Sequence, residues 1–141
     1  MSGTQNQITI ASFTSDITNA PPPPLLPPRS YRAELMGAAI RPVASNPNHL
    51  MWNLTFRVPP EEYPADYDGD PEGTIIYYSR ARAEDSMRGR HDTRKLMEKI
   101  GGPLSMRIDC NELIGLWANV EVVHSTFNDE TRAQVARVLA P

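Results

Sequence analysis

The stretch MWNLTFRV at residues 51–58 decides the fold class, because apolar and polar side chains alternate along it from Trp52 to Val58. This alternation is typical of a β-strand that buries one face and exposes the other. We therefore expect Trp52 and Phe56 to lie in the core and Arg57 to lie on the outer face. Pro59-Pro60 ends the strand, because proline lacks the backbone donor that a sheet requires.

Outward from this strand, alternation and β-branched residues predict four further strands, and a change to helical spacing predicts one helix ending at Ile100. Asp92 or Thr93 is expected to cap the helix, and the glycines at 101 and 102 to stop it. An extension of the helix over residues 84–90 is an open alternative, which Gly89 disfavours. Loops are expected at 42–48 and 61–72, a single helical turn at 109–115, and a hairpin turn at Asn128-Asp129. The further strands are predicted at 31–40, 74–80, 116–125 and 133–139.

The order of three strands, one helix and two strands predicts a mainly β fold. It is the order of a five-stranded OB-fold, a Greek-key barrel with one helix between strands 3 and 4. We place this domain at 30–141 and an extended, Pro-rich N-terminal arm at 1–29. Six prolines at 21–28 favour polyproline II in that arm. A stiff spacer, an arm on a neighbouring subunit and a PxxPxR ligand for an SH3 domain are open interpretations.

The charge is unevenly distributed along the chain. The net charge of −3 argues mildly against nucleic-acid binding, since such proteins are usually basic. However, residues 61–72 contain six acidic residues and no basic one, whereas residues 80–95 contain six basic residues and three acidic ones. We hypothesise that the acidic loop competes with DNA for the basic cluster as a phosphate mimic. It does not match an EF-hand calcium loop, because Pro71 and Tyr77 replace the required glycine and glutamate.

The C-terminal block from Asp109 to Val138 resembles the end of small bacteriophage single-stranded DNA-binding proteins with an OB-fold. Leu113-Ile114-Gly115 matches the turn with which this end begins in those proteins, residues 127–130 match their hairpin, and residues 132–137 match their last basic strand. The start of the domain, residues 26–35, also looks alike. Phe127 and Asp129 depart from the tyrosine and glycine of that hairpin. The family's acidic C-terminal tail is missing, so we do not expect recruitment of partners through such a tail.

This resemblance implies binding of single-stranded DNA without strong sequence preference, in phage replication or recombination. Such a site needs cations for the phosphates and flat side chains on which bases stack. The stacking candidates are Tyr77, Tyr78, Trp117 and Phe127. The cationic candidates are Arg57, Arg80, Arg82, Arg88, Arg90, Arg94, Lys95 and Arg132.

Each of these assignments has a structural alternative. Adjacent strand residues face opposite ways, so we expect one of Tyr77 and Tyr78 in the core and the other accessible. Trp117 could instead cover the arm or a subunit contact, and the arginine cluster could be a solvated helix face. The alternative function is a structural or interaction protein that uses an OB-like barrel as an assembly scaffold.

Several classes of protein are disfavoured by the sequence. No apolar run reaches ~18 residues, and the N-terminus lacks the features of a signal peptide, so we expect a non-secreted protein of the host cytoplasm. Cys110 is the single cysteine, which rules out an internal disulfide and paired-cysteine zinc sites. No nucleophile motif or phosphate loop accompanies the three histidines, so we predict no enzyme and no cofactor or metal. The expected partners are single-stranded DNA, further copies of the chain and phage replication or recombination proteins.

Overall fold

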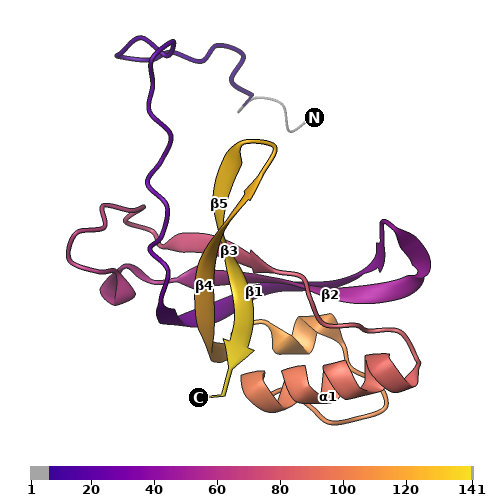
Figure 1. The fold of residues 1–141 in the computed structure, drawn as a ribbon. Helices are drawn as coiled ribbons and strands as arrows, with labels where there is room; N and C mark the ends of the chain where they lie inside the picture. The colour runs from indigo at the N-terminus through magenta and orange to yellow at the C-terminus, as the bar shows by residue number, and fades with distance from the viewer. Residues whose placement is uncertain (1–6, 141) are drawn as a thin grey trace.

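The computed structural model describes residues 7–140, and the first six residues of the predicted arm lie outside them. It confirms the mainly β class and the predicted order of three strands, one helix and two strands (Figure 1). Among the described residues, no helix combines the length and apolar character needed to cross a membrane. The elements are β1 (Ser30–Val43), β2 (Asn46–Val58), η1 (Pro60–Glu62), β3 (Thr74–Tyr78), α1 (Met87–Ile100), η2 (Cys110–Leu113), β4 (Trp117–Phe127) and β5 (Glu130–Leu139).

The five strands form one antiparallel sheet in the order β3-β2-β1-β4-β5. The long strand β1 lies at its centre and pairs with β4 through Ser30 to Glu34 and with β2 through Glu34 to Val43. The sheet curls so that its two edge strands, β3 and β5, contact each other, and α1 packs against β4 and β5. The result is a barrel-like sheet with one helix beneath it (Figure 1).

The alternation of β2 produces the core as predicted. Trp52, Leu54, Phe56 and Val58 are all buried, and so are the inward residues of β1 and β4. The indole Nε1 of Trp52 also donates to the Thr93 hydroxyl at 2.9 Å, which ties β2 to α1. The strand pattern therefore positions the helix as well as the sheet.

The predicted loop at 42–48 is wrong, because β1 and β2 continue into it and leave only a short turn at 44–45. The register shifts there, since Asn46 faces Val43 while Leu50 already faces Pro42. β4 pairs only with Ser30 to Glu34, so the second half of β1 is a sheet edge. Pro42 is tolerated in this part of β1, because the missing N–H of a proline at a sheet edge removes no hydrogen bond between strands.

The helix begins at Met87, so the caps predicted at Asp92 and Thr93 are wrong and the alternative extension into residues 84–90 is confirmed in part. Ser86 is the N-cap, and its side chain accepts from the Gly89 N–H at 3.0 Å, whereas Asp92 and Thr93 lie inside the helix. Gly89 suits this start, because a Cβ there would lie 1.8 Å from the Glu84 carbonyl oxygen. The predicted stop is confirmed, with Gly101 in the left-handed region at a φ of 75°.

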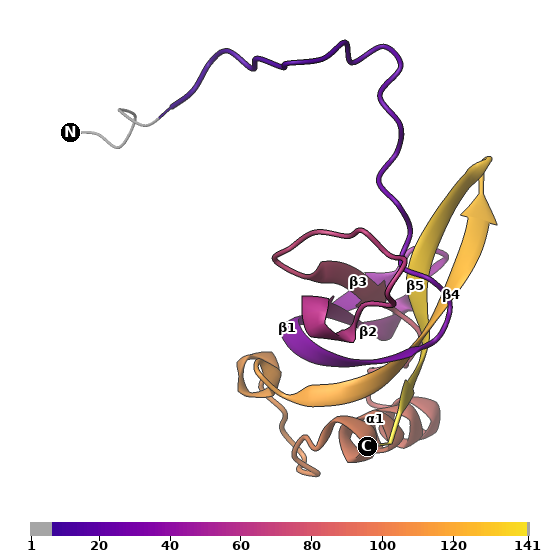
Figure 2. The same ribbon diagram turned by 90° about the vertical axis from the view of Figure 1, so that its left-hand side faces the viewer.

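The N-terminal segment leaves the sheet on the side opposite α1 and extends away from it (Figure 2). Residues 7–25 are exposed throughout, and Leu26 is the first buried residue, with 1% of its surface accessible. The Leu26 carbonyl lies 2.8 Å from His124 Nε2, and the Val122 N–H donates to the Arg29 carbonyl. The local sequence pattern does not reveal this anchor, because Leu26 lies among prolines and its partner is 98 residues away.

Candidate nucleic-acid interface

The twelve predicted site residues do not line one groove. Three lie on the outer sheet face or its rim: Arg57, Tyr77 and Trp117. Four line a pocket between β3, α1 and β5: Tyr78, Arg80, Arg88 and Lys95. Three lie around the start and far face of α1: Arg82, Arg90 and Arg94. Two lie on the β4–β5 hairpin: Phe127 and Arg132.

The two adjacent tyrosines of β3 point to opposite sides, as predicted. Tyr77 is 61% exposed on the outer face, and Tyr78 is half-buried and lines the pocket. Tyr77 pairs with Thr55 of β2, and Thr55 pairs in turn with Gly37 of β1. These neighbours are small, so the Tyr77 ring stands above its surroundings and offers a surface on which a base could stack.

Trp117 is less open. It is 36% exposed at the start of β4, and the Arg32 guanidinium lies 5.2 Å from the centre of its ring. This is a cation–π contact, which occupies one face of the indole. A base stacking on that face would have to displace Arg32.

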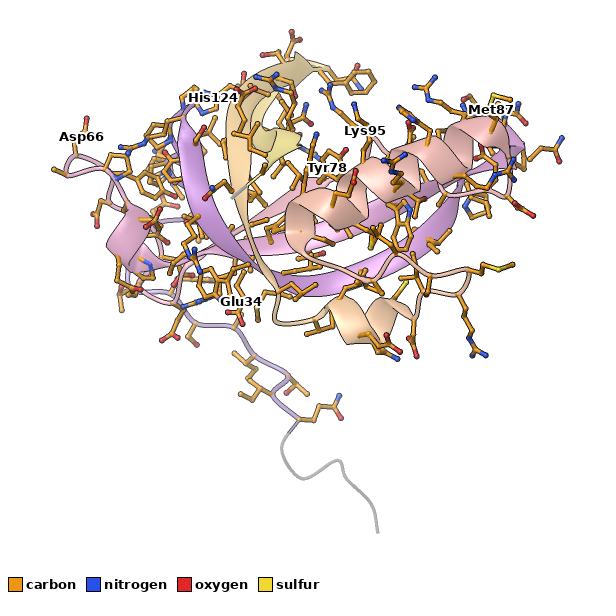
Figure 3. The ribbon with its side chains drawn as sticks, turned by 90° about the horizontal axis from the view of Figure 1, so that it is seen from below. Glu34, Asp66, Tyr78, Met87, Lys95 and His124 are labelled. Atoms are coloured by element: carbon orange, nitrogen blue, oxygen red, sulfur yellow. The ribbon has the colours of Figure 1, made fainter. Side chains whose placement is uncertain are left out.

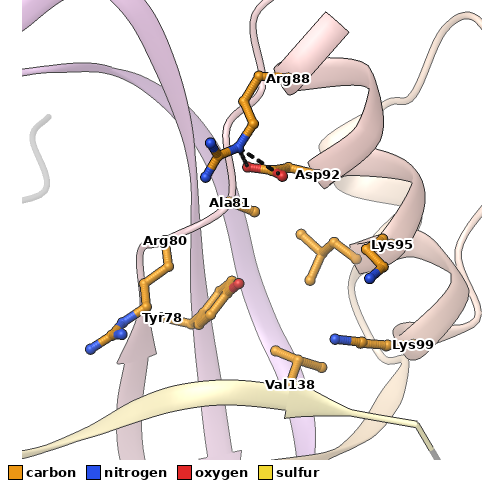
Figure 4. A pocket seen from close by; sticks show the side chains of 9 residues that line it. Tyr78, Arg80, Ala81, Arg88, Asp92, Lys95, Lys99 and Val138 are labelled. Carbon is orange, nitrogen blue, oxygen red and sulfur yellow. Dashed lines mark hydrogen bonds and ion pairs between the residues drawn. The ribbon is translucent and has the colours of Figure 1, made fainter.

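The pocket between β3, α1 and β5 has a volume of about 240 Å³ (Figure 4). Four cationic side chains and one carboxylate line it: Arg80, Arg88, Lys95, Lys99 and Asp92. Asp92 pairs with Arg88 at 3.1 Å. Within residues 7–140, no carboxylate forms an ion pair with Arg80, Lys95 or Lys99. The pocket therefore carries a net positive charge.

Lys99 was not among the predicted site residues. Its position could have been found from the sequence, because residues 88, 92, 95 and 99 recur at helical spacing and share one face of α1. The prediction treated the basic cluster as ending at Lys95.

The remaining arginines of the cluster are paired with acids. Arg90 pairs with Asp85 at 2.7 Å, and Arg94 pairs with Glu98 at 3.7 Å. Arg82 lies 2.9 Å from Glu84, and its hydrogen bonds lower the pKa of Glu84 to about 2, helped by the Leu50 N–H and the Ser86 hydroxyl. For these three arginines, the alternative interpretation fits: they belong to a solvated surface whose positive charges are neutralised by acids.

A second, larger cavity of about 680 Å³ lies between α1, the loop at 103–108 and the β1–β2 hairpin. Arg90 and Arg94 line this cavity, but much of its wall is apolar. The apolar lining comes from Ile40, Trp52, Met97, Pro103, Leu104, Met106 and Ile108.

The β4–β5 hairpin projects from the sheet, and Phe127 at its tip is 79% exposed. The turn is at Asn128-Asp129 as predicted, with φ values of 52° and 61°. Arg132 is engaged by Glu130 at 3.1 Å, so the hairpin offers an aromatic ring but a neutralised cation.

The acidic loop is held away from the cations of α1. Arg57 Nε donates to the Glu72 carbonyl at 2.7 Å, and the hydroxyls of Tyr63 and Tyr67 both lie within hydrogen-bond distance of Thr74 Oγ1. Figure 3 shows Asp66 at the left edge of the molecule and Lys95 on α1, near the middle of the view. The loop is therefore hydrogen-bonded to Arg57. Its position does not support the hypothesis that it competes with DNA for the cations of α1 within one molecule. In the described part of the chain, no three metal-ligating side chains gather in this loop or elsewhere.

The sequence was also compared with known proteins. No protein-family model and no curated protein matches it.

Proposed function

We propose that this chain is a single-stranded DNA-binding protein of phage type, and that its barrel-like sheet is an OB-fold. The strand order, the contact between β3 and β5, and the helix between β3 and β4 support the fold. The resemblance of the 109–138 block to phage single-strand binders supports the function. In this proposal the protein catalyses no reaction and acts with replication or recombination proteins in the host cytoplasm.

The observation that carries the proposal is the pair of side chains that β3 and the residues after it present. This one strand presents the exposed ring of Tyr77 on its outer face, and Arg80, which follows the strand, lies at the rim of the cationic pocket. A single strand needs a stacking surface beside a cationic path for its phosphates. Binding would begin with electrostatic capture at the pocket and proceed by stacking on Tyr77, with little sequence preference and strong salt dependence.

The test is fluorescence anisotropy of a labelled oligo-dT of ~30 nucleotides, with duplex DNA as competitor, at low and moderate salt. We expect salt-sensitive binding that prefers the single strand. Tyr77→Ala should weaken it by about 1–3 kcal/mol, the value of one stacked base. Tyr77→Phe keeps the ring and is the matched control, which should bind like the wild type. Absence of binding at low salt, or equal binding of the two variants, would reject the proposal.

A second candidate function, an assembly scaffold, is favoured by a different observation. The arm exposes Ile8, Ile10, Phe13 and Ile17, and the cavity beside α1 has exposed apolar walls. Unpaired apolar surfaces of this kind are typical of interaction sites. Here the arm of one copy would pack into the cavity of another. Removal of residues 1–20 should then convert an oligomer into a monomer in size-exclusion chromatography with light scattering. The same number of subunits in the full-length and the shortened protein would rule this arrangement out.

A further inference from the structure

We propose that the pocket between β3, α1 and β5 is a discrete binding site for one phosphate group, held by Lys95 and Lys99 with the Tyr78 hydroxyl as a further donor. This deepens the proposed function, on which it rests for the source of the phosphate. The pocket itself can be tested without a DNA strand.

The size of the pocket limits what it can hold. Its volume of about 240 Å³ lies below the roughly 300–1,000 Å³ of sites for drug-sized ligands. It therefore suits a phosphate with part of a sugar better than a larger ligand. Its walls come from three elements that the core holds together, since Leu96 of α1 and Val138 of β5 are both buried.

The net positive charge of the pocket favours the binding of an anion. Arg80, Lys95 and Lys99 have no carboxylate partner within the described residues, although acids neutralise the arginines on the far face of the same helix. Like charges gathered in a half-enclosed space repel one another, and a bound anion relieves that repulsion. Asp92 is not available to do so, because Arg88 Nε and the Arg82 N–H both donate to it at 3.1 Å.

Tyr78 adds a neutral donor. Its hydroxyl makes no hydrogen bond within residues 7–140, unlike the hydroxyls of Tyr31, Tyr63 and Tyr67. Burial and the nearby Asp92 raise its pKa, so the hydroxyl stays protonated at neutral pH. Figure 4 shows the hydroxyl of Tyr78 and the ammonium group of Lys99 directed into the hollow from opposite walls.

This donor set indicates a phosphate rather than a carboxylate. The pocket offers two ammonium groups and one hydroxyl from several directions, which matches the tetrahedral array of phosphate oxygens, whereas the Arg80 guanidinium is directed away from the hollow (Figure 4). Tyr77 and Tyr78 are neighbours on β3 and face opposite sides. A strand that crosses β3 can therefore stack a base on Tyr77 and place a phosphate beside Tyr78.

The experiment is a ¹⁵N–¹H NMR titration of the full chain with inorganic phosphate, thymidine monophosphate and thymidine, at ionic strength fixed with chloride. We expect both phosphates, but not thymidine, to shift the amides at 78–81 and 95–99. Lys95→Gln/Lys99→Gln should weaken phosphate binding at least tenfold. Arg107→Gln, which removes a charge outside the pocket, should leave it unchanged. Shifts spread evenly over the surface cations, or an undiminished affinity in the double variant, would overturn the proposal.

Oligonucleotides distinguish the source of the phosphate. A dT₁₀ with a 5′-phosphate that binds more tightly than its 5′-hydroxyl form, with the preference lost in the double variant, assigns the pocket to a strand end. Equal affinities that the double variant weakens equally assign it to internal phosphodiesters. If dT₃₀ binds but phosphate does not shift the pocket, the pocket assignment fails alone. If phosphate binds and dT₃₀ does not, the proposed DNA-binding function fails and the pocket remains.

Discussion

At the scale of single residues, Tyr31 links the proline-rich segment to the core. Its ring is buried, its hydroxyl donates to the Pro27 carbonyl at 2.7 Å, and burial raises its pKa to about 12. We predict that Tyr31→Phe lowers the free energy of unfolding by about 1 kcal/mol at pH 7, the value of one hydrogen bond.

The raised pKa of Tyr31 sets the pH dependence of that effect. Its contribution is complete below the unfolded pKa of about 10 and is lost as the pH rises towards the folded value of about 12. The stability difference between wild type and Tyr31→Phe in urea unfolding should therefore shrink from pH 7 to pH 11. A difference that stays constant over this range would contradict the assignment.

The sequence predicted those residues whose environment follows from their own strand or helix. The burial of Trp52 and Phe56 and the opposite orientations of Tyr77 and Tyr78 follow from period-2 alternation. The burial of Leu26 depends on β4, which is distant in sequence, so local pattern could not reveal it.

At the scale of elements, the start of α1 is set by Ser86. We predict that Ser86→Ala lowers the free energy of unfolding by about 1 kcal/mol, because the N-terminal N–H of Gly89 loses its acceptor. Ser86→Thr keeps the acceptor and should retain most of the stability. Urea unfolding followed by circular dichroism measures both variants, and equal losses in the two would show that the cap is unimportant.

The residues just before α1 also give an acid-sensitive contact. The Arg82 guanidinium, the Leu50 N–H and the Ser86 hydroxyl all bond to Glu84. Because its folded pKa of about 2 lies below the usual value of 4.5, its contribution is present above pH 4.5 and is lost as the pH falls to about 2. Glu84→Gln should be less stable than wild type at pH 7, and urea unfolding should show this deficit shrinking by pH 2.5. A deficit that is the same at both pH values would refute this role.

At the scale of the whole molecule, basic residues that form one cluster in the sequence lie on two separate surfaces of the fold. Residues 80–95 are contiguous in the chain, which suggested a single groove, but the helix turns Arg88, Lys95 and Lys99 towards β5 and turns Arg90 and Arg94 towards the apolar cavity. The helical period predicts this separation. Which face meets β5 depends on the curl of the sheet, and the sequence does not reveal that.

This division makes electrostatic and stacking contributions separable. The logarithm of the affinity for single strands falls with the logarithm of the salt concentration by about 0.7 for each neutralised phosphate. Lys95→Gln/Lys99→Gln removes cations from the pocket, so it should lower this slope as well as the affinity. Tyr77→Ala removes only the ring, so it should weaken binding at every salt concentration and leave the slope unchanged. Anisotropy titrations with dT₃₀ at four or more salt concentrations measure both quantities, and a slope that changes with Tyr77→Ala but not with the double variant would reverse the two roles.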